Sequence, residues 1–160
     1  QNTIEKWCNL DIDYIGAPWI EQPWVSTFRQ SLSDSASRLI WLSKKLINFD
    51  KREEPLAGNG GLSLRRVKTF FIISILLKIF PFLVESEWNE DVIWSLVVPR
   101  YFPWFKVGDF KQAIQFCMES HPAKCLMLNE GNLPFGIHAW DKNVGFWARY
   151  IEKEGYSLRQ

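Results

Sequence analysis

The chain has 160 residues, of which 47% are hydrophobic and 16% aromatic, with nine Trp and twelve Phe. Its 19 basic and 18 acidic residues leave a net charge of +1, which argues against a dedicated nucleic-acid-binding protein, since such proteins carry a large basic excess. A domain of this size buries about 70% of its unfolded surface, so we expect a single domain over residues 1–160 with a substantial core.

The first half of the chain predicts a strand followed by a helix. A short strand is expected at Tyr14 and Ile15, where it runs into a Gly-Ala-Pro loop. A helix is predicted over residues 31–47, because Ser33 or Asp34 can cap it and leucines recur at helical spacing.

The second half predicts further helices and one strand. From Arg66 to Phe80 the polar residues fall on one narrow stripe, so we expect a mostly buried helix that Pro81 ends. The other predicted elements are a helix from Glu90 to Val98 that Asn89 caps and Pro99 stops, a helix over 109–118, a strand over 134–139 and a closing helix over 143–152. Strands interleaved with helices predict a mixed α/β layer architecture.

The cysteines and the apolar stretches indicate the compartment. The chain contains Cys8, Cys117 and Cys125, and an odd number argues for reduced thiols in a cytoplasmic protein. The spacing of Cys117, His121 and Cys125 is typical of zinc ligands, but a structural site needs four and no fourth lies nearby, so zinc is not predicted. The most apolar stretch, residues 70–84, is shorter than a spanning helix. We therefore expect no transmembrane segment in this chain, with membrane association through a missing segment as the alternative.

A glycine-rich turn, GNGGLSLR, occupies residues 58–65. Its adjacent glycines, Gly60 and Gly61, permit positive φ and let backbone amides approach a ligand closely. The segment has neither the Lys-Ser or Lys-Thr of a P-loop nor the spacing of the dinucleotide fingerprint. On this motif alone a tight turn before a strand is the favoured interpretation, and a ligand-binding loop is the alternative.

Two carboxylates, Glu90 and Asp91, open the helix that follows the most apolar stretch. The helix dipole stabilises each ionised form by about 0.3–1 kcal/mol, and this electrostatic role is one interpretation. In the other, Asp91 removes the proton from an attacking hydroxyl, while Glu90 holds an acceptor hydroxyl or braces the loop.

One histidine and several tryptophans complete the candidate residues. His138 lies between apolar neighbours, where a hydrogen-bonded core histidine is the favoured interpretation and a ligand for Mn²⁺ or a similar ion is the alternative. Trp19, Trp24 and Trp140 lie beside the predicted loops. Indole faces pack well against sugar rings, so one of them is a candidate sugar platform, although core packing is the favoured role of any single Trp.

The order of these motifs resembles a known family. The motifs are YIGAPW over 14–19, GNGGLSLR over 58–65, NEDV over 89–92 and PFGIHAW over 134–140. Together they strongly resemble a family that is catalogued as a domain of unknown function and grouped with GT-A-type glycosyltransferases. Ala113, Phe116 and Glu119 also match its pattern, and the resemblance covers residues 11–140.

The resemblance implies a Rossmann-like GT-A nucleotide-sugar fold that lacks its N-terminal part, with this chain as the C-terminal portion of the domain. It implies Asp91 and Glu90 as catalytic residues, His138 as a ligand of a divalent cation (Mn²⁺ or Mg²⁺), and a glycine-rich loop that shapes the donor and acceptor pocket. The donor and acceptor site expected from the loop and its surroundings comprises Asn59, Gly60, Gly61, Ser63, Arg65 and Trp140. Arg65 faces the donor diphosphate in one interpretation and solvent in the other.

GT-A enzymes also carry an Asp-x-Asp metal motif, which Asp11-Ile12-Asp13 imitates. We expect this segment not to be that motif, because it runs directly into YIGAPW, which in the family lies downstream of the metal motif. The genuine motif is then expected before Gln1.

The predicted function is a metal-dependent, inverting glycosyltransferase. It would move a sugar from a nucleotide-diphosphate donor, with a UDP-sugar as the leading choice, to a glycan or other hydroxyl acceptor. The alternative is a non-catalytic carbohydrate-binding or scaffold domain with the same fold. A metal-dependent hydrolase is the weakest interpretation, because the chain has few His and Asp residues that could assemble such a site.

Overall fold

The computed structural model describes residues 3–20, 57–84 and 88–158. The chain divides into two compact units, residues 1–20 with 56–160 and residues 21–55, and every described residue belongs to the first. The helix predicted over residues 31–47 and the candidate Trp24 lie outside the described residues.

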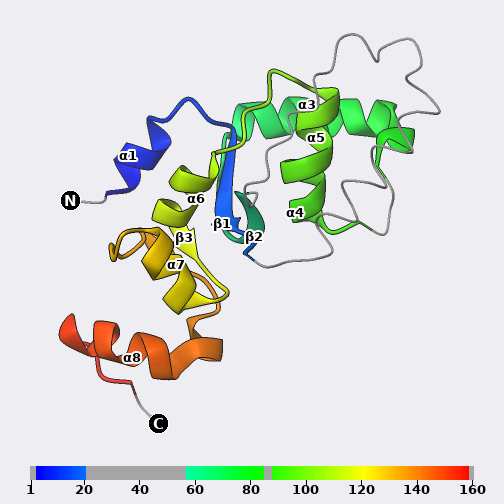
Figure 1. The fold of residues 1–160 in the computed structure, drawn as a ribbon. Coiled ribbons are helices and arrows are strands. Elements are labelled where there is room, and N and C mark those ends of the chain that lie inside the picture. The colour runs from blue at the N-terminus through cyan, green and yellow to red at the C-terminus, as the bar shows by residue number, and fades with distance from the viewer. Residues whose placement is uncertain (1–2, 21–56, 85–87, 159–160) are drawn as a thin grey trace. The chain divides into compact units, whose positions relative to one another are not determined.

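The described part is a mixed α/β structure with short strands (Figure 1). The strands are β1 (Tyr14–Pro18), β2 (Ala57–Arg65), β3 (Cys117–Met118) and β4 (Gly136–Ile137). The helices are α1 (Ile4–Cys8), α3 (Val67–Ile79), α4 (Glu90–Val92), α5 (Val98–Tyr101), α6 (Phe110–Phe116), α7 (Pro122–Leu128) and α8 (Val144–Lys153). Two 3-10 turns, η1 (Pro81–Leu83) and η3 (Trp140–Asn143), and a π-helical turn, η2 (Ile93–Val97), complete the described elements.

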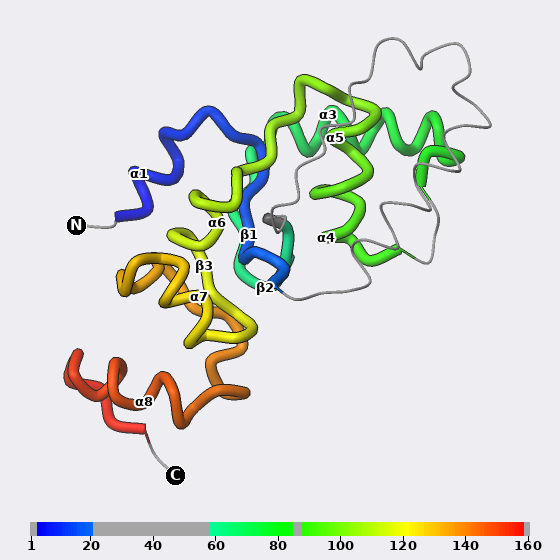
Figure 2. Tube along the Cα trace, viewed as in Figure 1, coloured from blue at the N-terminus to red at the C-terminus, as the bar shows by residue number. Residues whose placement is uncertain are grey.

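The antiparallel pair β1–β2 contains a large bulge (Figure 2). Pairing passes from Ile15 opposite Leu64 directly to Ala17 opposite Asn59, so residues 60–63 of β2 lie opposite Gly16 alone. Extra residues on one strand bend that strand locally and turn its side chains in new directions. The bulge contains both Gly60 and Gly61 of the glycine-rich motif.

Strand β1 is buried along its whole length, which is why it shows no alternation of polar and apolar residues. It extends to Pro18, beyond the two residues predicted, because a proline at the end of a strand gives up no essential ladder donor. Ile15 and Ala17 pack with Trp7, Ala113, Phe116 and Cys117, and Tyr14 packs with Ile73, Val98 and Phe105. A further cluster consists of Ile20, Ile114, Met118, Cys125 and Trp147.

The helix predicted from Arg66 to Phe80 is present as α3, but the prediction that it is mostly buried is wrong. Only Thr69 and Ile73 are buried, whereas Val67 is 79% exposed and Phe71 is 67% exposed. An apolar composition on all sides predicted burial on all sides. In the described structure, only one side of α3 packs against the cluster of Tyr14, Val98 and Phe105. Among the described residues, no helix is both long and apolar enough to cross a bilayer.

The helix that begins at Glu90 was predicted to stop at Pro99. That prediction is wrong, because the helix continues to Tyr101. Proline lacks the N–H that would bond the carbonyl of Ser95, and the preceding turn is the π-helical η2. The wider turn lets the chain continue as helix through the proline. Asn89 holds the N-cap position, although its side chain makes no capping hydrogen bond.

After residue 105 the three predicted elements, over 109–118, 134–139 and 143–152, are present with shifted ends, whereas α7 and β3 were not predicted. Asp109 caps α6 in a capping box, in which it accepts from the backbone N–H of Gln112 while the Gln112 side chain accepts from that of Asp109. The helix ends at Phe116, and the next two residues form β3, which pairs in parallel with β4. The predicted strand over 134–139 is shortened to Gly136–Ile137, and the closing helix α8 buries Trp147 as expected.

The three thiols differ sharply in their surroundings, and this difference is testable. Cys8 is exposed, whereas Cys117 and Cys125 are buried. Burial raises the pKa of Cys117 to about 12 and that of Cys125 to about 11. Because the thiolate is the reactive form, we expect a disulfide reagent at pH 8 to modify one thiol rapidly and two slowly. A Cys8→Ser variant should lose the rapid phase, and rapid modification of all three thiols would contradict the packing of α6, α7 and β3.

Candidate functional site

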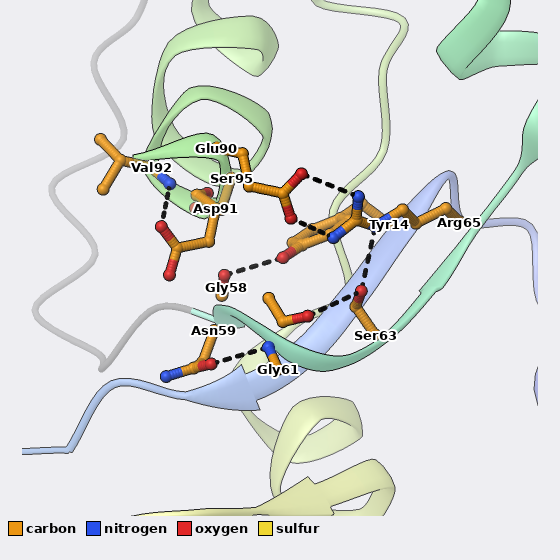
Figure 3. A network of polar contacts seen from close by, with 11 residues as sticks. Tyr14, Gly58, Asn59, Gly61, Ser63, Arg65, Glu90, Asp91, Val92 and Ser95 are labelled. Carbon is orange, nitrogen blue, oxygen red and sulfur yellow. Dashed lines mark hydrogen bonds and ion pairs between the residues drawn. The ribbon is translucent and has the colours of Figure 1, made fainter. Parts of the chain in front are cut away.

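The glycine-rich segment lies against the first turn of the helix that begins at Glu90. A Cβ atom on Gly60 would lie 3.0 Å from Oε1 of Glu90 and 3.3 Å from Cβ of Asp91. Likewise a Cβ atom on Gly58 would lie 2.6 Å from Oγ of Ser95, one turn further along the helix. Figure 3 shows Glu90 and Asp91 extending from the helix toward this segment. The absence of side chains at Gly58 and Gly60 is therefore what lets the first turns of this helix approach the backbone of β2.

The imidazole of His138 contacts the neighbouring glycine. A Cβ atom on Gly61 would lie only 2.0 Å from Cε1 and 2.2 Å from Nδ1 of His138. Two predicted motifs, the acidic pair and the histidine, thus contact adjacent residues of a third motif. The three segments were expected to converge as parts of one site, and these contacts bring them together.

The glycine pair serves close contact rather than an unusual backbone conformation. Neither Gly60 nor Gly61 has positive φ, the conformation for which the sequence analysis considered them suited. Local hydrogen bonds hold the segment instead. Oδ1 of Asn59 accepts from the Gly61 N–H at 2.9 Å, and the Ser63 hydroxyl donates to the Gly60 carbonyl at 3.4 Å. The side chains of Asn59 and Ser63, both predicted as ligand-binding, are thus used within the loop.

Arg65 and Glu90 form a two-pronged ion pair across the site (Figure 3). Nη1 of Arg65 donates to Oε2 of Glu90 at 3.1 Å, and Nη2 donates to Oε1. The hydrogen bonds from the guanidinium hold the pKa of the Glu90 carboxyl below its usual range. Since the Glu90 side chain is 60% exposed, the pair adds little to stability, and its effect is to fix geometry. The ion pair joins Glu90 to the end of β2, and whether Glu90 also holds an acceptor hydroxyl stays a prediction.

Several contacts position the guanidinium of Arg65. Its Nε donates to the Ser63 hydroxyl at 3.0 Å, and its Cζ lies 5.7 Å from the ring centroids of both Tyr14 and Phe70. Arg65 therefore faces Glu90 and two aromatic rings rather than open solvent. Planar stacking of this kind is a property of arginine that lysine does not share.

Tyr14 is a site residue that the sequence analysis assigned only to a strand. Its hydroxyl donates to the carbonyl of Gly58 at 2.8 Å, and burial raises its pKa well above the usual range. The hydroxyl therefore stays protonated at physiological pH and ties β1 to the start of the glycine-rich segment. The feature of the sequence that could have indicated this role is its place as the first residue of the YIGAPW motif. In the structure, Tyr14 contacts both the glycine-rich segment and Arg65.

Asp91 differs from Glu90 in having an available oxygen. Its Oδ1 accepts from the backbone N–H of Val92 at 2.8 Å. Within the described part of the chain, its other carboxylate oxygen has no hydrogen-bond partner. The Ser95 hydroxyl donates to the Asp91 carbonyl and fixes the turn that carries the side chain. Asp91 is thus a positioned and half-buried carboxylate with one free acceptor.

His138 has an acidic neighbour, Glu119. Nδ1 of His138 lies 3.2 Å from Oε1 of Glu119, but the atoms are not aligned for a hydrogen bond. Nδ1 of His138 and Oε2 of Glu119 are both buried polar atoms without a hydrogen-bond partner. Such atoms are rare, because leaving them unsatisfied costs about 1–3 kcal/mol each. The backbone N–H of His138 bonds the Met118 carbonyl at 3.0 Å, so the β3–β4 pairing carries the two side chains together.

The aspartates of Asp11-Ile12-Asp13 are occupied by structural contacts. The buried Asp13 accepts from the Thr69 hydroxyl at 2.7 Å and from the Lys106 N–H at 2.9 Å, and it lies 3.1 Å from Nε of Arg66. Asp11 is exposed and pairs with the Lys106 ammonium. Both carboxylates are thus engaged by side chains and backbone of the chain itself. In the regions that the structure describes, no group of three or more His, Cys, Asp or Glu residues could hold a metal ion.

The two described tryptophans of the candidate set have different surroundings. Trp19 is buried, and a Cβ atom on Gly58 would lie 2.8 Å from its ring, so it packs against the base of the site. Trp140 opens η3 two residues after His138 and is 40% exposed. Of these two, Trp140 has the surface available to stack on a ligand.

Comparison with known families places the chain. Residues 1–138 match the model of a family described as a protein of unknown function (DUF5672). The chain belongs to this family. The matched region of this DUF5672 member includes the glycine-rich segment, the acidic pair and His138, while Trp140 lies just beyond it. No curated protein and no solved structure matches the chain significantly.

Proposed function

We propose that this DUF5672 protein is a glycosyltransferase that moves a sugar from a nucleotide-diphosphate donor to a hydroxyl acceptor. The observation that carries the proposal is the contact of adjacent glycines with two chemically different groups. Gly60 contacts the acidic pair and Gly61 contacts the imidazole of His138. A Rossmann-like GT-A fold is part of the proposal, which the mixed α/β architecture and the sequence resemblance support.

Asp91 is the proposed general base. Both carboxylate oxygens of Glu90 accept hydrogen bonds from Arg65, which lower the pKa of that carboxyl and make it the weaker base. The free oxygen of Asp91 can take the proton of an acceptor hydroxyl as that hydroxyl attacks the anomeric carbon. The diphosphate then leaves from the opposite face, which inverts the anomeric centre. Glu90 and Arg65 act as positioning residues that hold the segment beside Asp91.

A divalent cation, if the enzyme uses one, would be held in part by His138. The unsatisfied Nδ1 of His138 and Oε2 of Glu119 suit a metal that accepts nitrogen and oxygen ligands. These two side chains are too few for a complete site, so a cation would depend on further oxygen ligands, such as those of the donor diphosphate. Bound there, it would neutralise charge on the leaving diphosphate.

Replacing Asp91 tests the proposal. In the intact protein, Asp91→Asn is expected to lower sugar transfer by about 10²–10⁴-fold, because general-base catalysis contributes that much. Donor binding should persist, measured as the rise in melting temperature that a panel of nucleotide sugars with Mn²⁺ produces. Asp141→Asn is the matched control, since Asp141 is an exposed carboxylate in η3. Undiminished transfer by the Asp91→Asn variant would exclude Asp91 as the base.

The exposed face of Trp140 favours one alternative, a non-catalytic carbohydrate-binding domain. This alternative predicts glycan binding that needs neither nucleotide nor metal and that Trp140→Ala abolishes. The transferase instead predicts that nucleotide sugars raise the melting temperature. The same thermal-shift series, run with free glycans, therefore distinguishes the two functions.

A further inference from the structure

The longest described helix, α3, presents an uncovered apolar face. Val67, Phe71, Ile75 and Ile79 recur every four residues and therefore form one row along the helix. They are 79%, 67%, 44% and 61% exposed, respectively. Large exposed apolar patches mark sites that bind a protein or a membrane. We call the exposed set the α3 face, and it comprises Val67, Phe71, Ile72, Ile75, Ile79, Phe80 and Phe82.

Aromatic residues extend the face beyond the end of the helix. Phe80 is 43% exposed and Phe82 is 71% exposed, and their rings meet edge to face with centroids 6.0 Å apart. Pro81 ends the helix between them and begins η1. Exposed apolar residues are therefore found both on α3 and in η1, which follows it directly in the chain (Figure 1).

Every charged residue in the stretch of sequence that carries the α3 face is basic. Residues 55–84 contain no Asp or Glu. Lys68 and Lys78 are exposed near the two ends of α3, and neither forms an ion pair with any residue that the structure describes. Arg65 and Arg66, by contrast, are already paired with Glu90 and Asp13. Two uncompensated ammonium groups thus flank the apolar row.

We propose that the α3 face docks on the surface of an anionic lipid bilayer, with the helix lying in the interface. Apolar side chains would enter the boundary between headgroups and acyl chains, while the lysine stems reach back so that Lys68 and Lys78 meet lipid phosphates. The two lysines, which form no ion pair with any described residue, complement the negative charge of such a surface. At 13 residues, α3 is about 20 Å long, too short to span a hydrocarbon core of about 30 Å.

Sedimentation with vesicles tests this proposal. The wild-type chain is expected to sediment with vesicles of phosphatidylcholine containing phosphatidylglycerol, and much less with phosphatidylcholine alone. A Phe71→Ser/Ile75→Ser double variant should bind at least about tenfold more weakly, because it removes apolar side chains that would become buried in the bilayer on binding. Lys68→Gln and Lys78→Gln should each weaken binding to anionic vesicles about fivefold.

A matched control uses two exposed apolar residues outside the α3 face. Met127 is 70% exposed and Tyr156 is 71% exposed, so Met127→Ser/Tyr156→Ser removes similar apolar surface and should leave vesicle binding unchanged. Circular dichroism serves as the check that each variant is folded. Failure of the wild-type chain to bind anionic vesicles would overturn the proposal, as would equal binding by the Phe71→Ser/Ile75→Ser variant. If light scattering finds a dimer that this variant dissociates, and no vesicle binding, a second copy covers the face instead.

Discussion

An Asp13→Ala variant is expected to lose about 3 kcal/mol of unfolding free energy, because it removes a buried, fully engaged carboxylate. The change leaves the Thr69 hydroxyl and the Lys106 N–H without their acceptors and leaves the Arg66 guanidinium beside an empty position. These three partners come from α3, from the segment before α6 and from the N-cap of α3, so the loss spreads over several elements. Urea unfolding, with the slope compared between variants, measures the effect.

Asp11→Ala is the control from the same motif. Asp11 has a side chain that is 82% exposed, and its removal should change stability by no more than about 0.5 kcal/mol. The pair of variants separates a structural carboxylate from a metal ligand. If Asp13 belonged to a cluster of metal-binding acids, its removal without metal would leave stability unchanged or raise it, and that result would overturn the structural assignment.

Gly61→Ala is expected to destabilise the protein by about 2 kcal/mol, since the added methyl group would overlap the imidazole of His138. The ring must move away, and it can do so only by disturbing its contact with Glu119 on the end of β3. Thermal unfolding and the NMR signals of the His138 ring report the two consequences. Under the proposed function, the variant should also lose sugar transfer.

Gly145→Ala provides the contrast. Gly145 lies in α8, and a Cβ atom there meets no other atom within 4 Å. The same substitution should therefore stabilise the protein, by up to about 1 kcal/mol, because alanine favours helix more than glycine does. Equal effects of the two substitutions would show that the position of Gly61 against His138 is incorrect.

Local patterns predicted the secondary structure well where local forces decide it. A helix was predicted to begin at Asp109, which is the N-cap of α6, and Pro81 marked the end of α3. The sequence could not show which side of α3 meets the core, because nearly every side of that helix is apolar. It also could not show that a π-helical turn carries the helix through Pro99, since that depends on the packing of Val97 and Val98.

Three of the motifs that the structure brings together were predicted from the sequence, but the contacts among them and the part of Tyr14 were not. Motif order alone brought the glycine-rich segment, the acidic pair and His138 together as a hypothesis. The ion pair of Arg65 with Glu90 spans 25 residues of sequence, and the bulge in β2 sets its geometry. Glu119 appeared only as the last letter of a family pattern, and its place beside His138 follows from the parallel pairing of β3 with β4.

The π-helical turn η2 also sets the direction of the carboxylates in front of it. Each helical residue advances the chain by about 100° around the axis, and a π turn adds one residue to the circuit. Glu90 and Asp91 are therefore rotated relative to Val97 and Val98, which anchor the helix in the interior. Deleting a single residue from 93–97 would remove the wider turn that accommodates Pro99 and would rotate both acids by about 100° relative to Val98, out of phase with β2. The number of residues between Asp91 and Val98 therefore fixes the direction of the Asp91 side chain, and a change in that number would turn the proposed base away from β2.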